Sequence, residues 1–209
     1  MRCVVSVVDE RGLGTAAALG ADLVEVRIDR FERPLDPEIL AGVREKVPLI
    51  LTLRTLAEGG RFDGSTEEFV GTLEPLVRPG DLVDIETGHA GVAPRIRRLG
   101  AEVIASHHGT SMPARDDLAR IERRLRSFGD VPKIVVTPSS ERDVLALCAF
   151  TLAAERPICT GVMGSSYRYA RVLLPLFGSE LVYCHAGRPA AEGQYHIADF
   201  RRIWALLAP

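Results

Sequence analysis

Lysine is scarce in this chain, and its scarcity draws attention to one position. Of the 26 lysine and arginine residues, 24 are arginine and two, Lys46 and Lys133, are lysine. An arginine keeps its charge almost anywhere, whereas a lysine buried among apolar side chains can lose its proton and become a nucleophile. Lys133 stands near the front of the apolar run VPKIVVTPSS. We therefore weigh a chemical role for Lys133 against the plainer alternative, an exposed lysine at the start of a strand.

The chain also lacks the features of several protein classes. Its formal net charge of -2 gives no basic excess for binding nucleic acid, so a small-molecule partner is the better expectation. No apolar run approaches the length of a membrane span, and the opening MRCVVSVV is too short for a signal peptide, so we expect a cytoplasmic protein with no membrane partner. The four cysteines form no CxxC pair, which argues against a disulfide framework and a zinc site and favours buried thiols.

No linker or low-complexity tract divides the sequence, so we expect one domain over residues 1–209. Short β-branched runs alternate with amphipathic segments, a pattern typical of parallel strands buried on both faces and joined by helices. The runs begin near residues 3, 22, 47, 81, 101, 133, 157 and 181. The helical segments cover residues 36–46, 65–77, 93–99, 114–128, 140–155, 167–177 and 197–207. This alternation predicts an α/β fold, a single (β/α)8 TIM barrel, with a doubly wound open sheet as the alternative.

In a barrel of this kind, catalytic residues collect where strands end. Glu25 and Arg27 alternate in DLVEVRIDRF and therefore point to the same face, either as a structural ion pair or as binding groups. The segment LTLRTLAEGGRF ends a strand with Arg54 and then places Glu58 before two glycines. A glycine pair allows a sharp turn or a close approach to a ligand, although a solvated loop with a stray charge fits this segment equally well.

Two adjacent histidines, His107 and His108, close the strand in VIASHHGTSMP. Successive strand residues face opposite ways, so at most one of them looks into the pocket, and either one alone fits a satisfied polar residue. On the next strand, Val135 and Thr137 share a face with Lys133, which would carry the lysine stem up inside the barrel. A lysine and a histidine at neighbouring strand ends form the pair that imine chemistry needs.

Arginines and a terminal loop complete the predicted site. We expect Arg27, Arg54 and Arg171 to favour the neutral amine through their positive charge and to hold an anionic substrate through paired hydrogen bonds. The segment HAGRPAAEGQYHI, which contains Gln194, follows the last strand. It fits a mobile lid that excludes water or an idle surface loop.

Taken together, these segments resemble the type I 3-dehydroquinases, the (β/α)8 lyases of the shikimate pathway to aromatic amino acids that work through a lysine Schiff base. The resemblance runs in order through ADLVEVRIDRF, LTLRTLAEGGRF, VIASHHGT, PKIVVTPSSERDVLAL, FGSELV and EGQ. It implies dehydration of 3-dehydroquinate to 3-dehydroshikimate with no metal or organic cofactor, and a homodimer is common in the family.

The resemblance also assigns roles to residues. It makes Lys133 the imine-forming lysine, His108 the general acid and base, and Glu58 the carboxylate that accompanies this histidine. The implied substrate-binding residues are Glu25, Arg27 and Arg54 at the hydroxyl side, Arg171 at the carboxylate and Gln194 in the lid.

The sequence departs from the family pattern in the lid and after the histidine. Ala190 stands where the family usually has a serine, Glu192 where it has a proline, and Gly109 follows His108 in place of an aspartate. The missing serine hydroxyl should weaken substrate binding by about one hydrogen bond, about 1 kcal/mol. Two other functions stay open: a class I aldolase, for which GVMGSS is a thin phosphate-binding candidate, and a barrel that binds a shikimate-type acid through a protonated, inert Lys133.

Overall fold

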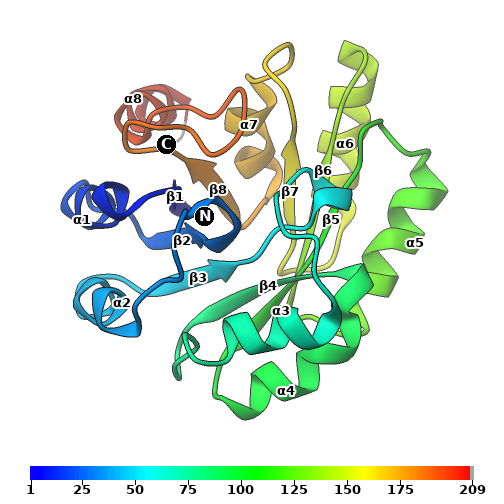
Figure 1. Cartoon of the computed structure of the whole chain (residues 1–209). Coiled ribbons are helices and arrows are strands. Elements are labelled where there is room, and N and C mark those ends of the chain that lie inside the picture. The colour runs from blue at the N-terminus through cyan, green and yellow to red at the C-terminus, as the bar shows by residue number, and fades with distance from the viewer. Residues whose placement is uncertain (208–209) are drawn as a thin grey trace.

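Eight parallel strands form the centre of the molecule, with helices around them (Figure 1). The structure is a computed structural model that describes residues 1–207, so the last two residues of the predicted 1–209 domain lie outside the described residues. The strands are β1 Arg2–Val7, β2 Leu23–Arg27, β3 Leu49–Thr52, β4 Leu82–Glu86, β5 Glu102–His108, β6 Val131–Val136, β7 Cys159–Val162 and β8 Leu181–Cys184. The predicted single-domain TIM barrel is confirmed, and all eight strand runs contain a strand.

The barrel is nearly closed. Consecutive strands pair in parallel from β1 to β7, and β1 also pairs with β8. Between β7 and β8 the described chain forms no ladder, and other hydrogen bonds hold the two strands together. The Glu180 amide donates to the Ile158 carbonyl at 2.8 Å, and the Thr160 amide donates to the Ser179 hydroxyl at 3.0 Å. The two strands are therefore joined near their amino-terminal ends, although they form no ladder.

The helices on the outside are α1 Glu10–Ala18, α2 Pro37–Arg44, α3 Thr66–Leu73, α4 Ala93–Arg98, α5 Arg115–Arg126, α6 Glu141–Ala153, α7 Ala170–Leu173 and α8 Ile197–Leu207. Helices α3 and α6 each begin with a capping box, since the Ser65 hydroxyl accepts from the Glu68 amide and the Ser140 hydroxyl accepts from the Asp143 amide. The predicted helix 167–177 divides into α7 and a 3-10 turn, η4 Leu174–Phe177, where Pro175 offers no amide hydrogen.

Helix α1 was not predicted, because its glycines and alanines show no clear apolar stripe. It is nevertheless capped, since the Asp9 carboxylate accepts from the Gly12 amide at 2.9 Å. All four cysteines are buried and unbonded to one another, as expected. Across residues 1–207, the helices are too short or too polar to span a bilayer.

The interior of the barrel has a layered order that follows from the strand pleat. One residue from each strand forms an apolar cluster at the amino-terminal end: Val4, Leu23, Ile50, Leu82, Ile104, Val131, Cys159 and Leu181. Two positions further along each strand the side chains point to the same face. Those positions are Ser6, Glu25, Thr52, Asp84, Ser106, Lys133, Gly161 and Tyr183. The apolar cluster therefore supports a layer made mostly of polar and charged groups.

Candidate active site

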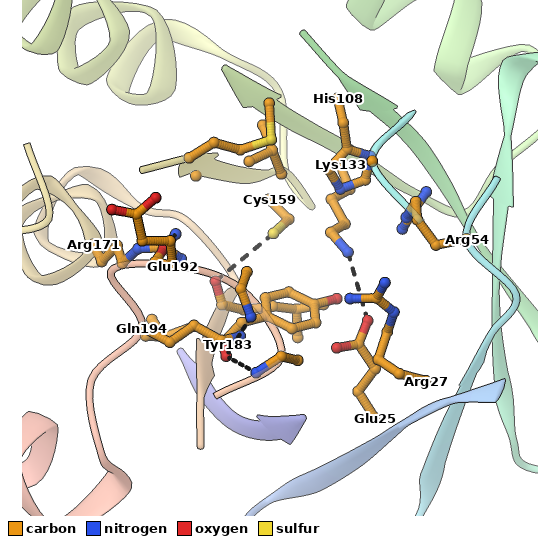
Figure 2. Close-up of a pocket in the computed structure, with 18 of the residues that line it drawn as sticks. Glu25, Arg27, Arg54, His108, Lys133, Cys159, Arg171, Tyr183, Glu192 and Gln194 are labelled. Atoms are coloured by element: carbon orange, nitrogen blue, oxygen red, sulfur yellow. Dashed lines mark hydrogen bonds and ion pairs between the residues drawn. The ribbon is translucent and has the colours of Figure 1, made fainter. Parts of the chain in front are cut away.

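A cavity of about 370 Å³ lies above the polar layer, at the carboxyl ends of the strands. Its lining includes all eight of the predicted site residues: Glu25, Arg27, Arg54, Glu58, His108, Lys133, Arg171 and Gln194. Figure 2 shows Lys133 and His108 on one side of it and Arg171 and Gln194 on another. Residues scattered over most of the sequence thus converge on one site, as the barrel prediction required.

Lys133 is enclosed. The residue is 4% exposed, and its stem rises inside the barrel so that the amine faces the cavity. The Nζ atom lies 2.9 Å from Asp84 Oδ2 and 3.9 Å from Glu25 Oε1. On another side it lies 4.1 Å from the centre of the Tyr183 ring. The exposed-lysine alternative is therefore wrong, and the amine sits among carboxylates and an aromatic face.

Asp84 organises the charges around the amine. Its Oδ2 atom accepts a hydrogen bond from the Lys133 amine at 2.9 Å and forms an ion pair with an Arg54 nitrogen at 2.9 Å. Its Oδ1 atom accepts a hydrogen bond from the Ser106 hydroxyl at 2.5 Å. Burial alone would raise the pKa of Asp84, but the charges of Arg54 and Lys133 outweigh it and hold that pKa below its usual value. Asp84 is therefore ionised at neutral pH.

The expectation that arginines supply the charge next to the amine needs correction. Arg54 does reach this region, but carboxylates neutralise it, since a second nitrogen donates to Glu86 Oε1 at 2.8 Å. Arg27 is held by Asp29, to which it makes two hydrogen bonds of 2.9 Å. The charged groups that contact the amine are the carboxylates of Asp84 and Glu25.

Glu58 and His108 form a second pair, which is partly buried. Glu58 Oε2 lies 2.8 Å from His108 Nδ1 and also accepts from the His108 amide at 3.1 Å. Burial, with the neighbouring carboxylate Glu86, raises the pKa of Glu58 to about 8. Burial, with the charges of Arg54 and Lys133, lowers the pKa of His108 well below its usual value. The imidazole is thus uncharged at neutral pH and able to accept a proton. Its neighbour His107 does not line the cavity, as the strand alternation predicted.

The glycine pair after Glu58 shapes the loop that presents this carboxylate. Gly59 adopts a left-handed backbone with φ of 83°, which favours glycine. At Gly60 an added Cβ would lie 2.0 Å from the Arg54 carbonyl oxygen, so the two backbone segments touch. At Gly60, the close approach is therefore between two segments of the protein backbone and not between the backbone and a ligand.

Glu25 connects the floor of the cavity to the lid. Its carboxylate accepts from the Ser6 hydroxyl at 2.5 Å and from the Thr52 hydroxyl at 3.0 Å. The Ser6 oxygen in turn accepts from Gln194 Nε2 at 3.2 Å. Gln194 also receives the Ala190 amide on its side-chain oxygen at 2.8 Å. The segment after β8 is thus folded over the cavity.

Arg171 lies at the rim beneath this segment. One of its terminal nitrogens donates to the Glu192 carbonyl at 3.1 Å, while its buried Nε has no hydrogen-bond partner among residues 1–207. Glu192, where the family has proline, accepts a 2.6 Å hydrogen bond from the Ser165 hydroxyl in the loop after β7. The Ala190 side chain is buried and brings no donor to the cavity.

Four polar residues around the amine were missed by the sequence analysis: Asp84, Glu86, Ser106 and Tyr183. Asp84 and Glu86 alternate in the strand DLVDIE, so the signal used for Glu25 and Arg27 was present there as well. Ser106 and Tyr183 are single polar residues in apolar runs and carry no comparable signal. Within the described residues, no group of three or more His, Cys, Asp or Glu side chains is arranged to hold a metal ion.

Comparison with known proteins gives a consistent result. A family model described as type I 3-dehydroquinase matches residues 8–208. A 3-dehydroquinate dehydratase from Methanoregula boonei is 47% identical over 209 residues, covering 100% of both chains, and one from Klebsiella pneumoniae is 35% identical over 94% of this chain and 88% of its own. The crystal structure of 3-dehydroquinate dehydratase from Geobacillus kaustophilus aligns with a TM-score of 0.89 at 26% identity, covering 99% of this chain and 90% of that one. The chain therefore belongs to the type I 3-dehydroquinase family.

Proposed function

We propose that this enzyme dehydrates 3-dehydroquinate to 3-dehydroshikimate in the shikimate pathway, through an imine between the substrate ketone and Lys133. The observation that carries the proposal is the enclosed Lys133 amine, which opens into the same cavity as the uncharged His108 imidazole. The family membership supports the reaction. A type I relative from Clostridium difficile, with a TM-score of 0.85 at 25% identity, carries covalently modified comenic acid, which supports covalent chemistry in this cavity.

The reaction begins when the Lys133 ammonium gives up a proton to the His108 imidazole and attacks the ketone carbon. Asp84 stays ionised and holds the amine in place as the proton leaves. His108 then returns a proton to the oxygen of the carbinolamine, which departs as water and leaves an iminium. Glu58, bound to His108 Nδ1, keeps the imidazole oriented and shares its proton.

The iminium acts as an electron sink for the second half. His108 removes a proton from the carbon next to it, the electrons move toward nitrogen, and the adjacent hydroxyl leaves as water with a proton from His108. Water then hydrolyses the imine, which frees the product and restores Lys133. The lysine supplies the electrophilic activation, so no metal or organic cofactor takes part in the proposed sequence.

The rest of the cavity suits an anionic, hydroxylated substrate. Arg171 has an unused buried Nε and lies at the rim, where a guanidinium holds a carboxylate through two hydrogen bonds. Glu25, Arg27 and Arg54 form the opposite polar wall, which we assign to the substrate hydroxyls. Gln194 lies on the Arg171 side of the cavity, and we assign it to covering the bound substrate.

Trapping with borohydride decides among the candidate functions. We expect 3-dehydroquinate to give an irreversible adduct and, without borohydride, to be converted to product. An adduct formed only with a phosphorylated sugar would favour an aldolase, and no adduct with either compound would favour a non-catalytic binder. The second and third results would each overturn the proposal.

A further inference from the structure

Tyr183 lies in the polar layer beside the reacting amine, yet neither the family resemblance nor the proposed mechanism uses it. It comes from β8, while Lys133 comes from β6, and the layer position on the intervening strand is Gly161, which has no side chain. The Lys133 amine lies 4.1 Å from the centre of the Tyr183 ring. Both residues line the cavity, and Figure 2 shows the phenol at its centre, with the hydroxyl toward the Lys133 and Glu25 side.

The hydroxyl of Tyr183 is buried without a hydrogen-bond partner in the described chain. An unsatisfied buried hydroxyl is destabilising, so buried tyrosines usually have a partner. Ser6, Thr52 and Ser106 lie in the same layer, and each donates to a carboxylate. Tyr183 is thus the hydroxyl of this layer whose hydrogen remains available to a molecule in the cavity.

We propose that the Tyr183 hydroxyl contacts the substrate and donates a hydrogen bond to the oxygen on the carbon that Lys133 attacks. The proposal rests on the imine mechanism above. The amine lies over the ring at 4.1 Å from its centre, so an oxygen two bonds away from the amine nitrogen can reach the edge that carries the hydroxyl. A donor placed there stabilises the negative charge that develops on the ketone oxygen during attack. No bond to hydrogen breaks in Tyr183 itself.

The surroundings of the phenol agree with a donor that keeps its proton. Burial, followed by nearby anionic groups such as Glu25 and Asp84, raises the pKa of Tyr183 well above its usual value. The group is therefore neutral wherever the enzyme works and cannot serve as a base. The face of the ring also contacts the Lys133 amine in the geometry of a cation–π interaction. Ring and hydroxyl thus have separable roles, which a conservative substitution can divide.

Tyr183→Phe keeps the ring and removes the hydroxyl. We expect the rate of borohydride-trapped adduct formation with 3-dehydroquinate to fall about 10- to 100-fold, at or below the lower end of the roughly 100- to 1000-fold losses seen for lost oxyanion donors. We expect the loss to appear in kcat and to stay constant from pH 6 to 9, because the phenol does not titrate there. Tm should hold or rise, since the variant removes an unsatisfied buried group. Tyr169→Phe, at an exposed tyrosine outside the cavity, is the matched control.

Each result has one meaning. Slower adduct formation with an unchanged or higher Tm supports the inference. Wild-type adduct formation by Tyr183→Phe overturns the inference and leaves the proposed function intact. Slower adduct formation by Tyr183→Phe together with a lower Tm, and with slowing in Tyr169→Phe as well, reports a structural role; it too overturns the inference and leaves the proposed function intact. Failure of the wild-type enzyme to form any adduct overturns the proposed function and this inference together.

Discussion

Two neighbouring layers inside the same barrel have opposite chemistry. In the lower layer, each of the eight strands contributes an apolar or thiol side chain. Two residues further along, the same strands contribute three hydroxyl groups besides the tyrosine, two carboxylates and one amine. The lower layer stabilises the barrel by excluding water, whereas the upper layer costs free energy wherever a charge there loses its partner. Residues near the amino-terminal ends of the strands therefore stabilise the fold, whereas residues two positions further along are available for function.

Removing the amine should have the largest effect of any change in the upper layer. We expect Lys133→Ala to lower kcat by more than about 10⁴-fold, because the variant has no nucleophile to form the imine. It should still bind substrate weakly and remain folded, since Asp84 keeps Arg54 as its partner. Lys46→Arg, at the other, exposed lysine, is the control and should keep wild-type activity. Near wild-type turnover by Lys133→Ala would end the imine mechanism.

His108→Ala should separate imine formation from the later steps. We expect kcat to fall about 10²- to 10⁴-fold, the usual contribution of a general acid and base. The adduct should still form, although more slowly because His108 also assists imine formation, and it should accumulate because the later proton removal depends on His108. Mass spectrometry without borohydride would detect the accumulated species. A variant that turns over slowly with no accumulation would mean that imine formation depends on His108 more than the later proton removal does.

One substitution in each layer should show how differently the two layers contribute to the unfolding free energy of the protein. Asp84→Asn leaves Lys133 and Arg54 without their shared carboxylate oxygen, so we expect unfolding free energy to fall by about 3–5 kcal/mol and activity to drop sharply. Ile50→Val, in the apolar cluster, should cost about 0.5–1.5 kcal/mol and leave kcat unchanged. Urea unfolding and steady-state kinetics measure both. Equal losses of stability in the two variants would contradict the distinction between the layers.

The protonated carboxyl in the upper layer should make stability depend on pH. Glu58 has a folded pKa of about 8, above its unfolded value, so the folded chain holds a proton that the unfolded chain releases. Its contribution to stability is lost as pH rises through 8, and we expect a loss on the order of 1–2 kcal/mol between pH 6.5 and 8. Below 6.5, His108 opposes this trend, because its folded pKa is depressed. Glu58→Gln should flatten the curve above pH 6.5, and a curve as steep as wild type would assign the effect elsewhere.

The lid should give the smallest effect. Restoring a hydroxyl with Ala190→Ser should lower KM about fivefold, the equivalent of one hydrogen bond of about 1 kcal/mol, with little change in kcat. The side chain at this position is buried against the cavity, so the hydroxyl would face the substrate. Glu192→Pro, which removes the contact with Ser165, is a useful companion. An unchanged KM in Ala190→Ser would mean that other lid contacts already hold the substrate.

The sequence predicted the strands, and it pointed to residues that the structure gathers around one cavity, for a common physical reason. A charged residue among β-branched residues is costly unless it has a role, so Glu25, Arg27 and Lys133 stood out. The same reasoning applies to Asp84, which also lies among β-branched and apolar residues. Partnerships were beyond reach, because the hydrogen bond from Gln194 to Ser6 joins residues 188 apart in the chain. The carboxylates that contact Lys133 were also beyond reach, because they depend on which groups the fold brings together.

The most direct test is to locate the trapped adduct. The chain has only two lysines, so digestion after incubation with 3-dehydroquinate and borohydride places the modification without ambiguity. The account predicts one adduct per chain, on the peptide that contains Lys133, and none in Lys133→Ala. An enzyme that converts the substrate yet carries its adduct on Lys46, or forms none at all, would contradict it.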